Sequence, residues 1–457
     1  SFTRCFKAND EYFPWANTIS AGNLESLTIS ECNFSRCGCR ENDMNREGGN
    51  VIGIFGLYDT LAAIRNCTFD TTSAVVSTYC ENTMFIGNKI IKCSRNTFRA
   101  SHQSGSQGLQ LIENHFFDIT NGCVINAWYY AGLRIQYPPI IVGNTFENIR
   151  TDPFGYEDGS KYAFVFDLDV VNSLLFEKNT FRNISTIFGG FAGHITSTTG
   201  PINLTFVDCY FDQNKQDIDN NNSINGGGFC STSGLNDGNI YLSFIKCQFT
   251  ENEVSKGNGG AIFIDTELSA YISDCQFISN KALSSEENNG LGGAIYISKV
   301  QGELTITGCE FEFNSAKEGQ AIYSIDSLTQ FILTKTNFIN NFNSKINDKE
   351  QYMIVLYTDE IDISHIRFTS LNQKSYPILF KDMPIISNIE FNDVNSTNTA
   401  LIVIPSYQDT NVFENVSFIN CYSCEYIIHT KGSFSYFNSK ILFNQHSNVK
   451  ALLLENG

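Results

Sequence analysis

A short hydrophobic frame recurs along the chain. It has two apolar residues two positions apart, a Cys or Asn three positions later, and a Phe two positions further, as in LTITGCEF at residues 304–311. Clear copies end at Phe34, Phe69, Phe116, Phe181, Phe211, Phe249, Phe277 and Phe311, and looser copies at Phe98, Phe146, Phe338, Phe368, Phe391, Phe418 and Phe443. The Phe position therefore recurs 15 times, at intervals of 18 to 38 residues. Such a repeat indicates a solenoid.

The phase of the frame predicts the shape of each repeat. Leu304 and Ile306 share one face of a strand, because strand side chains alternate, whereas Cys309 and Phe311 have the opposite parity. All four reach one core only if the chain bends once between Ile306 and Cys309. We therefore predict an all-β, right-handed, single-stranded parallel β-helix of about 15 coils over residues 27–457, with an N-terminal cap over 1–26.

A second pattern marks residues 204–342. The sequence Phe-x-x-Asn follows the frame at residues 211–214, 249–252, 277–280, 311–314 and 338–341. Gly-Gly-Ala-Ile stands between them at 259–262 and 292–295, with weaker copies at 226–229 and 319–322. Glycine pairs that enter a strand are expected where the chain turns tightly and no Cβ fits.

This combination resembles the repeats of the chlamydial polymorphic outer membrane proteins and of similar right-handed β-helix surface proteins in parasitic protists. The resemblance implies a surface-exposed β-helical passenger involved in adhesion. Asn-Thr-Phe at Asn96, Asn144 and Asn179 is similar instead to the asparagine ladder of pectate-lyase-like β-helices. The Gly-Gly-Ala-Ile motif occurs in strict form only twice.

The cysteines recur within the frame. Cys209, Cys247, Cys275 and Cys309 take the same position in successive coils, which predicts a column with Cα atoms about 5 Å apart. That spacing permits disulfides, but we favour a stack of small buried side chains that are interchangeable with Asn. The chain has 15 Cys, a density typical of an oxidising compartment.

Other cysteines lie close to the two ends of the chain. Cys5, Cys32, Cys37 and Cys39 predict disulfides that pin an end cap; a zinc site is disfavoured because no His accompanies them at ligand spacing. The Cys421-Tyr422-Ser423-Cys424 segment predicts a local disulfide or two unpaired thiols, since a redox motif needs a helix start after a strand.

Charge narrows the classes of partner. Asp and Glu outnumber Lys and Arg by 48 to 30, for a net charge of -18, which disfavours nucleic acid and other polyanions. The sequence has no apolar run long enough to span a membrane. We expect no cofactor and no metal site, because the six His are scattered.

We favour a non-enzymatic protein and keep catalysis as an alternative. Polysaccharide lyases and hydrolases need clustered carboxylates. The best candidates are Asp167 and Asp169 on one outward strand face, with Lys161 and Arg134 expected on nearby coils. An ordinary solvated strand face is the commoner explanation of such a pattern.

Seven Asn-x-Ser/Thr sequons are candidates for N-glycosylation: Asn33, Asn66, Asn183, Asn203, Asn221, Asn395 and Asn415. That number is close to what the composition gives by chance. Asn33 alternates with inward Cys32 and Phe34, so we expect its side chain to face outward. Asn221 lies in a polar run expected to form a loop.

These features predict an extracellular or cell-surface structural protein. Both ends of a β-helix expose strand edges that need a cover. Residues 451–454 are apolar and show no cap, so either the native chain continues past 457 or another molecule stacks there, head to tail, as in a fibre. The alternatives are a surface adhesin that binds host or matrix ligands and, third, a polysaccharide lyase or hydrolase.

Overall fold

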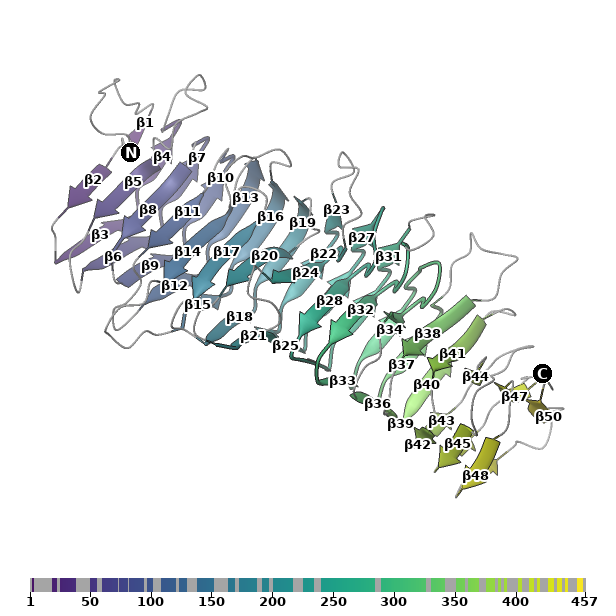
Figure 1. Ribbon diagram of the computed structural model, residues 1–457. Coiled ribbons are helices and arrows are strands. Elements are labelled where there is room, and N and C mark those ends of the chain that lie inside the picture. Colours follow the sequence, from purple (N-terminus) through teal and green to yellow (C-terminus); the bar gives the residue numbers. More distant parts are fainter. Residues whose placement is uncertain are drawn as a thin grey trace. The chain divides into compact units, whose positions relative to one another are not determined.

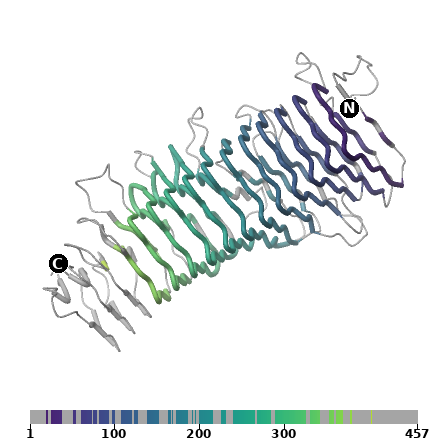
Figure 2. Tube along the Cα trace, turned by 180° about the vertical axis from the view of Figure 1, so that it is seen from behind, coloured from purple at the N-terminus to yellow at the C-terminus, as the bar shows by residue number. Residues whose placement is uncertain are grey.

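A computed structural model shows the described residues mainly as β-strands (Figures 1 and 2). The chain divides into two compact units. The first unit contains residues 1–220 and 231–239, and the second contains 221–230 and 240–457. The described residues are 2–3, 19–22, 25–37, 50–55, 60–72, 74–80, 82–93, 97–101, 108–120, 123–129, 138–151, 163–168, 172–186, 191–196, 200–216, 225–233, 240–283, 289–325, 330–341, 351–357, 361–369, 375–382, 385–387, 390–392, 402–404, 411–414, 417–419, 426–430, 434–437, 440–442 and 450–454.

The strands of the first unit form three parallel sheets. Sheet 1 holds β2 (Ile19–Gly22), β5 (Asn50–Phe55), β8 (Ala74–Tyr79), β11 (Phe98–Ser101), β14 (Ile125–Tyr129), β17 (Phe164–Leu168) and β20 (Phe191–Thr196). Sheet 2 holds β3 (Ser26–Ser30), β6 (Leu61–Arg65), β9 (Asn82–Ile86), β12 (Leu109–Ile112), β15 (Ile140–Val142), β18 (Ser173–Glu177) and β21 (Ile202–Val207). Sheet 3 holds β1 (Phe2–Thr3), β4 (Asn33–Ser35), β7 (Thr68–Asp70), β10 (Lys89–Ile91), β13 (His115–Thr120), β16 (Thr145–Arg150), β19 (Thr180–Thr186), β22 (Tyr210–Asp212) and β23 (Lys215–Gln216).

The second unit repeats this order of three sheets. Sheet 1 holds the start of β24 (Phe229–Ser233), then β28 (Ile262–Glu267), β32 (Ile295–Val300), β35 (Ile322–Ser324), β38 (Gln351–Tyr357), β41 (Ser375–Asp382), β44 (Ile402–Ile404), β47 (Tyr426–Thr430) and β50 (Lys450–Leu454). Sheet 2 holds β25 (Ile240–Ile245), β29 (Ser269–Ser273), β33 (Glu303–Thr307), β36 (Gln330–Thr334), β39 (Ile361–Ser364), β42 (Ile385–Ser387), β45 (Asn411–Glu414) and β48 (Phe434–Phe437). Sheet 3 holds β26 (Gln248–Thr250), β27 (Glu253–Val254), β30 (Gln276–Ile278), β31 (Lys281–Ala282), β34 (Glu310–Glu312), β37 (Asn337–Ile339), β40 (Ile366–Thr369), β43 (Glu390–Asn392), β46 (Ser417–Ile419) and β49 (Lys440–Leu442).

The predicted all-β parallel β-helix is confirmed. Each coil sends one strand to sheet 1, one to sheet 2 and a short segment to sheet 3, and each strand pairs in parallel with its counterpart in the next coil. Sheet 2 has seven described strands in the first unit and eight in the second, which agrees with the predicted number of about 15 coils.

The predicted one-residue corner lies between sheets 2 and 3. Gly308, directly before Cys309, has a φ of 65°, and Lys178 and Asp274 hold the same place in other coils with φ of 54° and 53°. A second left-handed corner lies two residues after the Phe in the coils where the structure describes that position, for example at Gln213. The corners bring all frame side chains into one interior.

Stacked phenylalanines fill much of this interior. The rings of Phe277 and Phe311 lie 4.6 Å apart at 6°, and those of Phe311 and Phe338 lie 4.9 Å apart at 8°. All three side chains are fully buried. Offset stacking of this kind adds to the hydrophobic gain of burying the rings.

Two looser copies of the Phe position were assigned to the wrong residues. Ile90, in β10, pairs with Phe69 on one side and Phe116 on the other, so it fills the place expected for Phe98. Phe98 begins β11 in sheet 1 instead. Likewise Ile441 pairs with Phe418, and Phe443 lies outside the described residues. An aliphatic side chain fills the same core position, so the aromatic requirement was too strict.

The glycine pairs lie where the backbones of neighbouring coils approach closely, as the sequence predicts. Gly259 has a φ of 73°, and a Cβ on Gly260 would lie 2.1 Å from the carbonyl oxygen of Gly293 and 2.5 Å from the backbone nitrogen of Lys281. Gly293 lies equally close to the next coil, since a Cβ added to it would lie 2.1 Å from the carbonyl oxygen of Gln320. Only glycine fits between these backbones.

The two ends of the sequence are described in part. Within the predicted cap, β1 pairs with β4 and β2 pairs with β5, and most other residues of 1–26 lie outside the described part. The apolar run 451–454 belongs to β50, which pairs with β47.

Candidate functional site: buried ladders and outward faces

Asparagine ladders line the two corners of the coils. The backbone N–H and the Nδ2 of Asn114 donate to Oδ1 of Asn144, both at 2.9 Å, and Nδ2 also donates to the carbonyl oxygen of Phe85 at 2.7 Å. The ladder runs through Asn88, Asn114, Asn144 and Asn179. The predicted ladder is therefore present at Asn144 and Asn179, while the predicted Asn96 lies outside the described residues.

The asparagines of the Phe-x-x-Asn motif form a second ladder at the other corner. Asn252, Asn280, Asn314 and Asn341 are buried and bonded in succession, with Nδ2 to Oδ1 distances of 2.9 to 3.0 Å. A buried amide needs its donors and its acceptor satisfied, and each one meets this need in the neighbouring coils. The motif is therefore structural.

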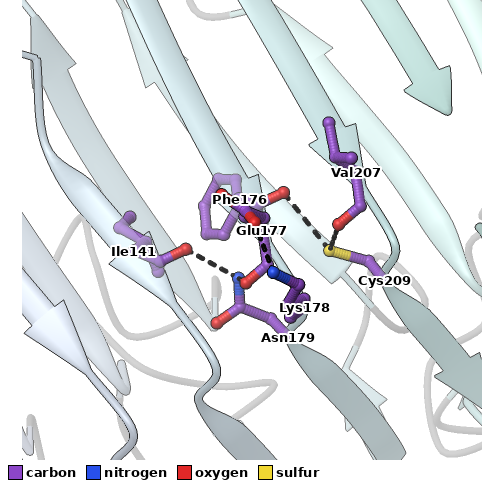
Figure 3. Close-up of polar contacts among 7 residues, drawn as sticks. All are labelled: Ile141, Phe176, Glu177, Lys178, Asn179, Val207 and Cys209. Atoms are coloured by element: carbon purple, nitrogen blue, oxygen red, sulfur yellow. Dashed lines mark hydrogen bonds and ion pairs between the residues drawn. The ribbon is translucent and has the colours of Figure 1, made fainter.

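Cysteine substitutes for asparagine in the first column. Sγ of Cys275 accepts from the backbone N–H of Cys247 at 3.3 Å and donates to the carbonyl oxygen of Phe244 at 3.5 Å. An asparagine at this position makes the equivalent of both bonds and adds the Nδ2 to Oδ1 bond of the ladder. Figure 3 shows both types: Asn179 donates to Ile141 at 2.8 Å, and Cys209 donates to Phe176 at 3.4 Å.

No disulfide joins the described cysteines to one another. They include the disulfide candidates Cys32, Cys37, Cys209, Cys247, Cys275 and Cys309; the candidates Cys5, Cys39, Cys421 and Cys424 lie outside the described residues. Burial raises the pKa of Cys275 well above its usual range, with further increases from Cys247 and Cys309. A protonated, buried thiol is unreactive, which fits the packing interpretation.

The structure places the catalytic candidates only in part. Asp167 lies in β17, in register with Trp128 of β14 and Thr196 of β20. The Asp167 side chain, Asp169, Lys161 and Arg134 lie outside what the structure describes. The catalytic role of these carboxylates stays a prediction.

A polar row that the sequence did not reveal lies beside Asp167. Ser77, Arg99 and Asn126 are in register on adjacent strands β8, β11 and β14 of sheet 1. Their strand neighbours Val76, Phe98 and Ile125 fill the core at 0% exposure, so the three polar side chains face outward.

Ser77 and Asn126 are buried although they face away from the core, and Arg99 is half-buried. Ser77 is 1% exposed and Asn126 is 6% exposed. Within the described residues, Oγ of Ser77 and Oδ1 of Asn126 have no hydrogen-bond partner, and Arg99 is the residue in register between them. Unsatisfied buried oxygens call for a water or a ligand that donates to them.

In the second unit the outward face of sheet 1 is apolar. Phe263, Tyr296 and Tyr323 are in register and 5% to 8% exposed, with ring separations of 5.4 and 5.8 Å. Burial, with smaller contributions from the neighbouring Tyr323 and Asp265, raises the pKa of Tyr296 to about 12. This row belongs to a second, outer hydrophobic cluster, which the sequence analysis did not anticipate.

Four of the seven sequons lie within the described residues, and all four asparagines are exposed: Asn33, Asn66, Asn183 and Asn203. Asn33 faces outward as predicted. Asn183 donates through Nδ2 to Oδ1 of the half-buried Asn148 at 2.7 Å. The sequons at Asn221, Asn395 and Asn415 lie outside the described residues.

The chain matches no protein-family model, no curated protein and no solved structure. Within the described residues, no group of three or more His, Cys, Asp or Glu is placed to hold a metal ion. The described part also contains no helix with the length and apolarity needed to cross a membrane.

Proposed function

We propose that the protein is a non-enzymatic structural β-helix of the cell surface or extracellular space. The main support for this proposal is that the repeated side chains are used for internal packing and hydrogen bonding. The Phe, Asn and Cys of successive coils bond and stack on one another in the interior, which makes each coil a building unit that stabilises the next. The resemblance to β-helix surface proteins points to the same location.

Exposed sequons support an extracellular glycoprotein. In each described sequon the middle residue, for example Phe34 or Leu204, is buried, so the Asn and the following Ser or Thr share the outward face. Asn33, Asn66, Asn183 and Asn203 therefore present their amides to the surface, where N-glycans are accommodated.

We expect the protein isolated from its source to carry N-glycans at one or more of these four asparagines. Enzymatic deglycosylation in heavy-oxygen water converts each modified Asn into labelled Asp, which peptide mass spectrometry locates. The control is the same peptide set without the glycosidase. Unmodified asparagines at all four sites would contradict the glycoprotein part of the proposal.

Head-to-tail assembly into a fibre is the second part of this proposal. Negative-stain electron microscopy of the native protein separates the two cases: continuous fibres support a polymer subunit, and isolated particles support a surface protein that acts singly.

A second candidate function is adhesion through a saccharide ligand, and the polar row on sheet 1 favours it. Saccharide hydroxyls can donate to Oγ of Ser77 and Oδ1 of Asn126 and accept from Arg99. A neutral saccharide suits the net charge of -18 better than a polyanion does.

This function predicts that Asn126→Ala and Ser77→Ala each weaken binding of neutral oligosaccharides by about tenfold, since each removes one buried hydrogen bond. Glycan-array screening followed by calorimetry measures the loss. Ser173→Ala, on the outward face of sheet 2, is the matched control and should not change affinity. Unaltered binding in both variants would rule out this site. Polysaccharide turnover abolished by Asp167→Asn would favour an enzyme instead.

A further inference from the structure

The outward face of sheet 2 in the first unit is unusually apolar. Ile140 and Leu175 are 42% and 40% exposed, and they lie in register on the adjacent strands β15 and β18. Half-buried aliphatic residues surround them on the same face: Met84, Ile86, Ile112, Val142 and Val207. Contiguous exposed apolar patches mark interaction surfaces more often than they mark free surface.

Two register rows make up this face. In strand order from β3 to β21, the first row is Thr28, Ala63, Met84, Gln110, Ile140, Leu175 and Thr205. The second row is Ser30, Arg65, Ile86, Ile112, Val142, Glu177 and Val207. In the second row, Arg65 and Glu177 bracket three aliphatic residues.

The seven strands are centred on β12, and opposite charges lie at equal distances from it. A two-fold axis that lies in the interface and runs along β12 reverses the order of the strands and keeps each position along a strand. It therefore brings β6 opposite β18, β9 opposite β15, and β12 opposite itself. Two-fold interfaces of this kind use one self-complementary patch on both copies.

We propose that a second copy of this chain packs on this face, with the coils of the two copies in opposite order. Arg65 then meets Glu177 of the partner subunit, and by symmetry the pair forms twice. Small Ala63 faces the large side chain of the partner's Leu175, and Met84 faces the partner's Ile140. This complementarity of charge and of side-chain size is the reason to expect a second copy of the chain on this face.

The two charged side chains are already held close to the face. Nη2 of Arg65 lies 3.6 Å from Sδ of Met84, so the guanidinium leans over the apolar row. Oε1 of Glu177 accepts from Nζ of Lys178 at 2.8 Å, which leaves Oε2 for the partner's guanidinium. Arginine and carboxylate make short charge-assisted bonds when water is displaced around them.

Asn203 of β21 lies on the same outward face of sheet 2, so the pairing requires this sequon to carry no glycan. In every other respect the pairing does not depend on the proposed function. It also differs from head-to-tail stacking, which would join ends. At about 0.15 M salt the Debye length is about 8 Å, so the net charge of each copy is largely screened while the short Arg–Glu pairs persist.

Sedimentation equilibrium at that salt concentration tests the pairing. We expect Arg65→Glu to weaken dimerisation at least tenfold, since the new carboxylate would face Glu177 of the partner subunit in both symmetric pairs. Glu177→Arg should do the same, and the double variant should restore dimerisation to within about threefold of the natural chain. Leu175→Asp should abolish it. Tyr210→Ser is the matched control: Tyr210 is 53% exposed but lies on sheet 3.

Cross-linking tests the geometry of the dimer directly and does not rely on a change in dimerisation affinity. Gln110 lies on the axis, so Gln110→Cys should join to its own counterpart through a short bismaleimide across the roughly 10 Å between packed sheets. Thr205→Cys lies opposite Thr28 of the partner subunit and should not join to itself. A natural chain that sediments as a monomer throughout its soluble range, or a double charge reversal that fails to restore pairing, would overturn the proposal.

Discussion

Replacing Gly260 by alanine is expected to lower the free energy of unfolding of the second unit by more than about 4 kcal/mol. The added Cβ would lie 2.1 Å from the Gly293 carbonyl oxygen and 2.5 Å from the Lys281 nitrogen, and both atoms belong to backbone held in the coil-to-coil hydrogen bonds. No flexible side chain can yield, so the coils themselves must move apart. Urea unfolding followed by circular dichroism measures the loss.

The matched control is Gly143→Asn. Gly143 has a φ of 66°, and its Cβ would come no closer than 3.4 Å to the Glu113 side chain. Lys178 holds the same corner of another coil with a φ of 54°, and asparagine tolerates this conformation well. We expect a change below about 1 kcal/mol. Similar losses for Gly143→Asn and Gly260→Ala would show that the corner conformation, and not close approach, explains the glycines.

Asn280→Ala is expected to cost about 3 kcal/mol. Oδ1 of Asn280 accepts from the backbone N–H and Nδ2 of Asn252 at 3.1 and 2.9 Å, and its Nδ2 donates to Phe249 and Asn314 at 2.9 and 3.0 Å. Alanine removes this acceptor and this donor in the fully buried interior, where water cannot replace them.

Asn280→Cys distinguishes hydrogen bonding from simple packing. Cysteine makes the equivalent pair of bonds in the first column, so Asn280→Cys should lose clearly less stability than Asn280→Ala. Asn337→Ala, on the half-buried outward side of β37, should change stability by less than about 0.5 kcal/mol. Equal losses for alanine and cysteine at 280 would contradict the hydrogen-bonding account.

Much of the fold follows from the parity of the frame. Leu304, Ile306, Cys309 and Phe311 can share a core only if the chain turns at one residue, and the structure has that turn at Gly308. The assignment failed where the frame lacked its aromatic residue. Ile90 fills a phenylalanine place because the core selects for apolar volume, whereas the nearest phenylalanine, Phe98, lies in sheet 1.

The outward faces were harder to predict for a different reason. Ser77 and Asn126 are single polar residues within strands, and such residues usually face solvent. Their burial and their alignment with Arg99 become visible only when β8, β11 and β14 are placed in register. The same holds for Arg65 and Glu177, which are far apart in sequence and are related only through the order of strands in sheet 2.

The corner ladders have one more consequence, which concerns how such a chain changes length. The bonds that each ladder residue, whether Asn280 or Cys275, makes outside its own coil go to the coils immediately before and after it. An inserted or deleted segment that spans one whole coil therefore leaves every remaining ladder bond with an equivalent partner, whereas a partial coil breaks the register of all three sheets. The protein can therefore become longer or shorter by whole coils without losing the hydrogen bonds between the coils that remain.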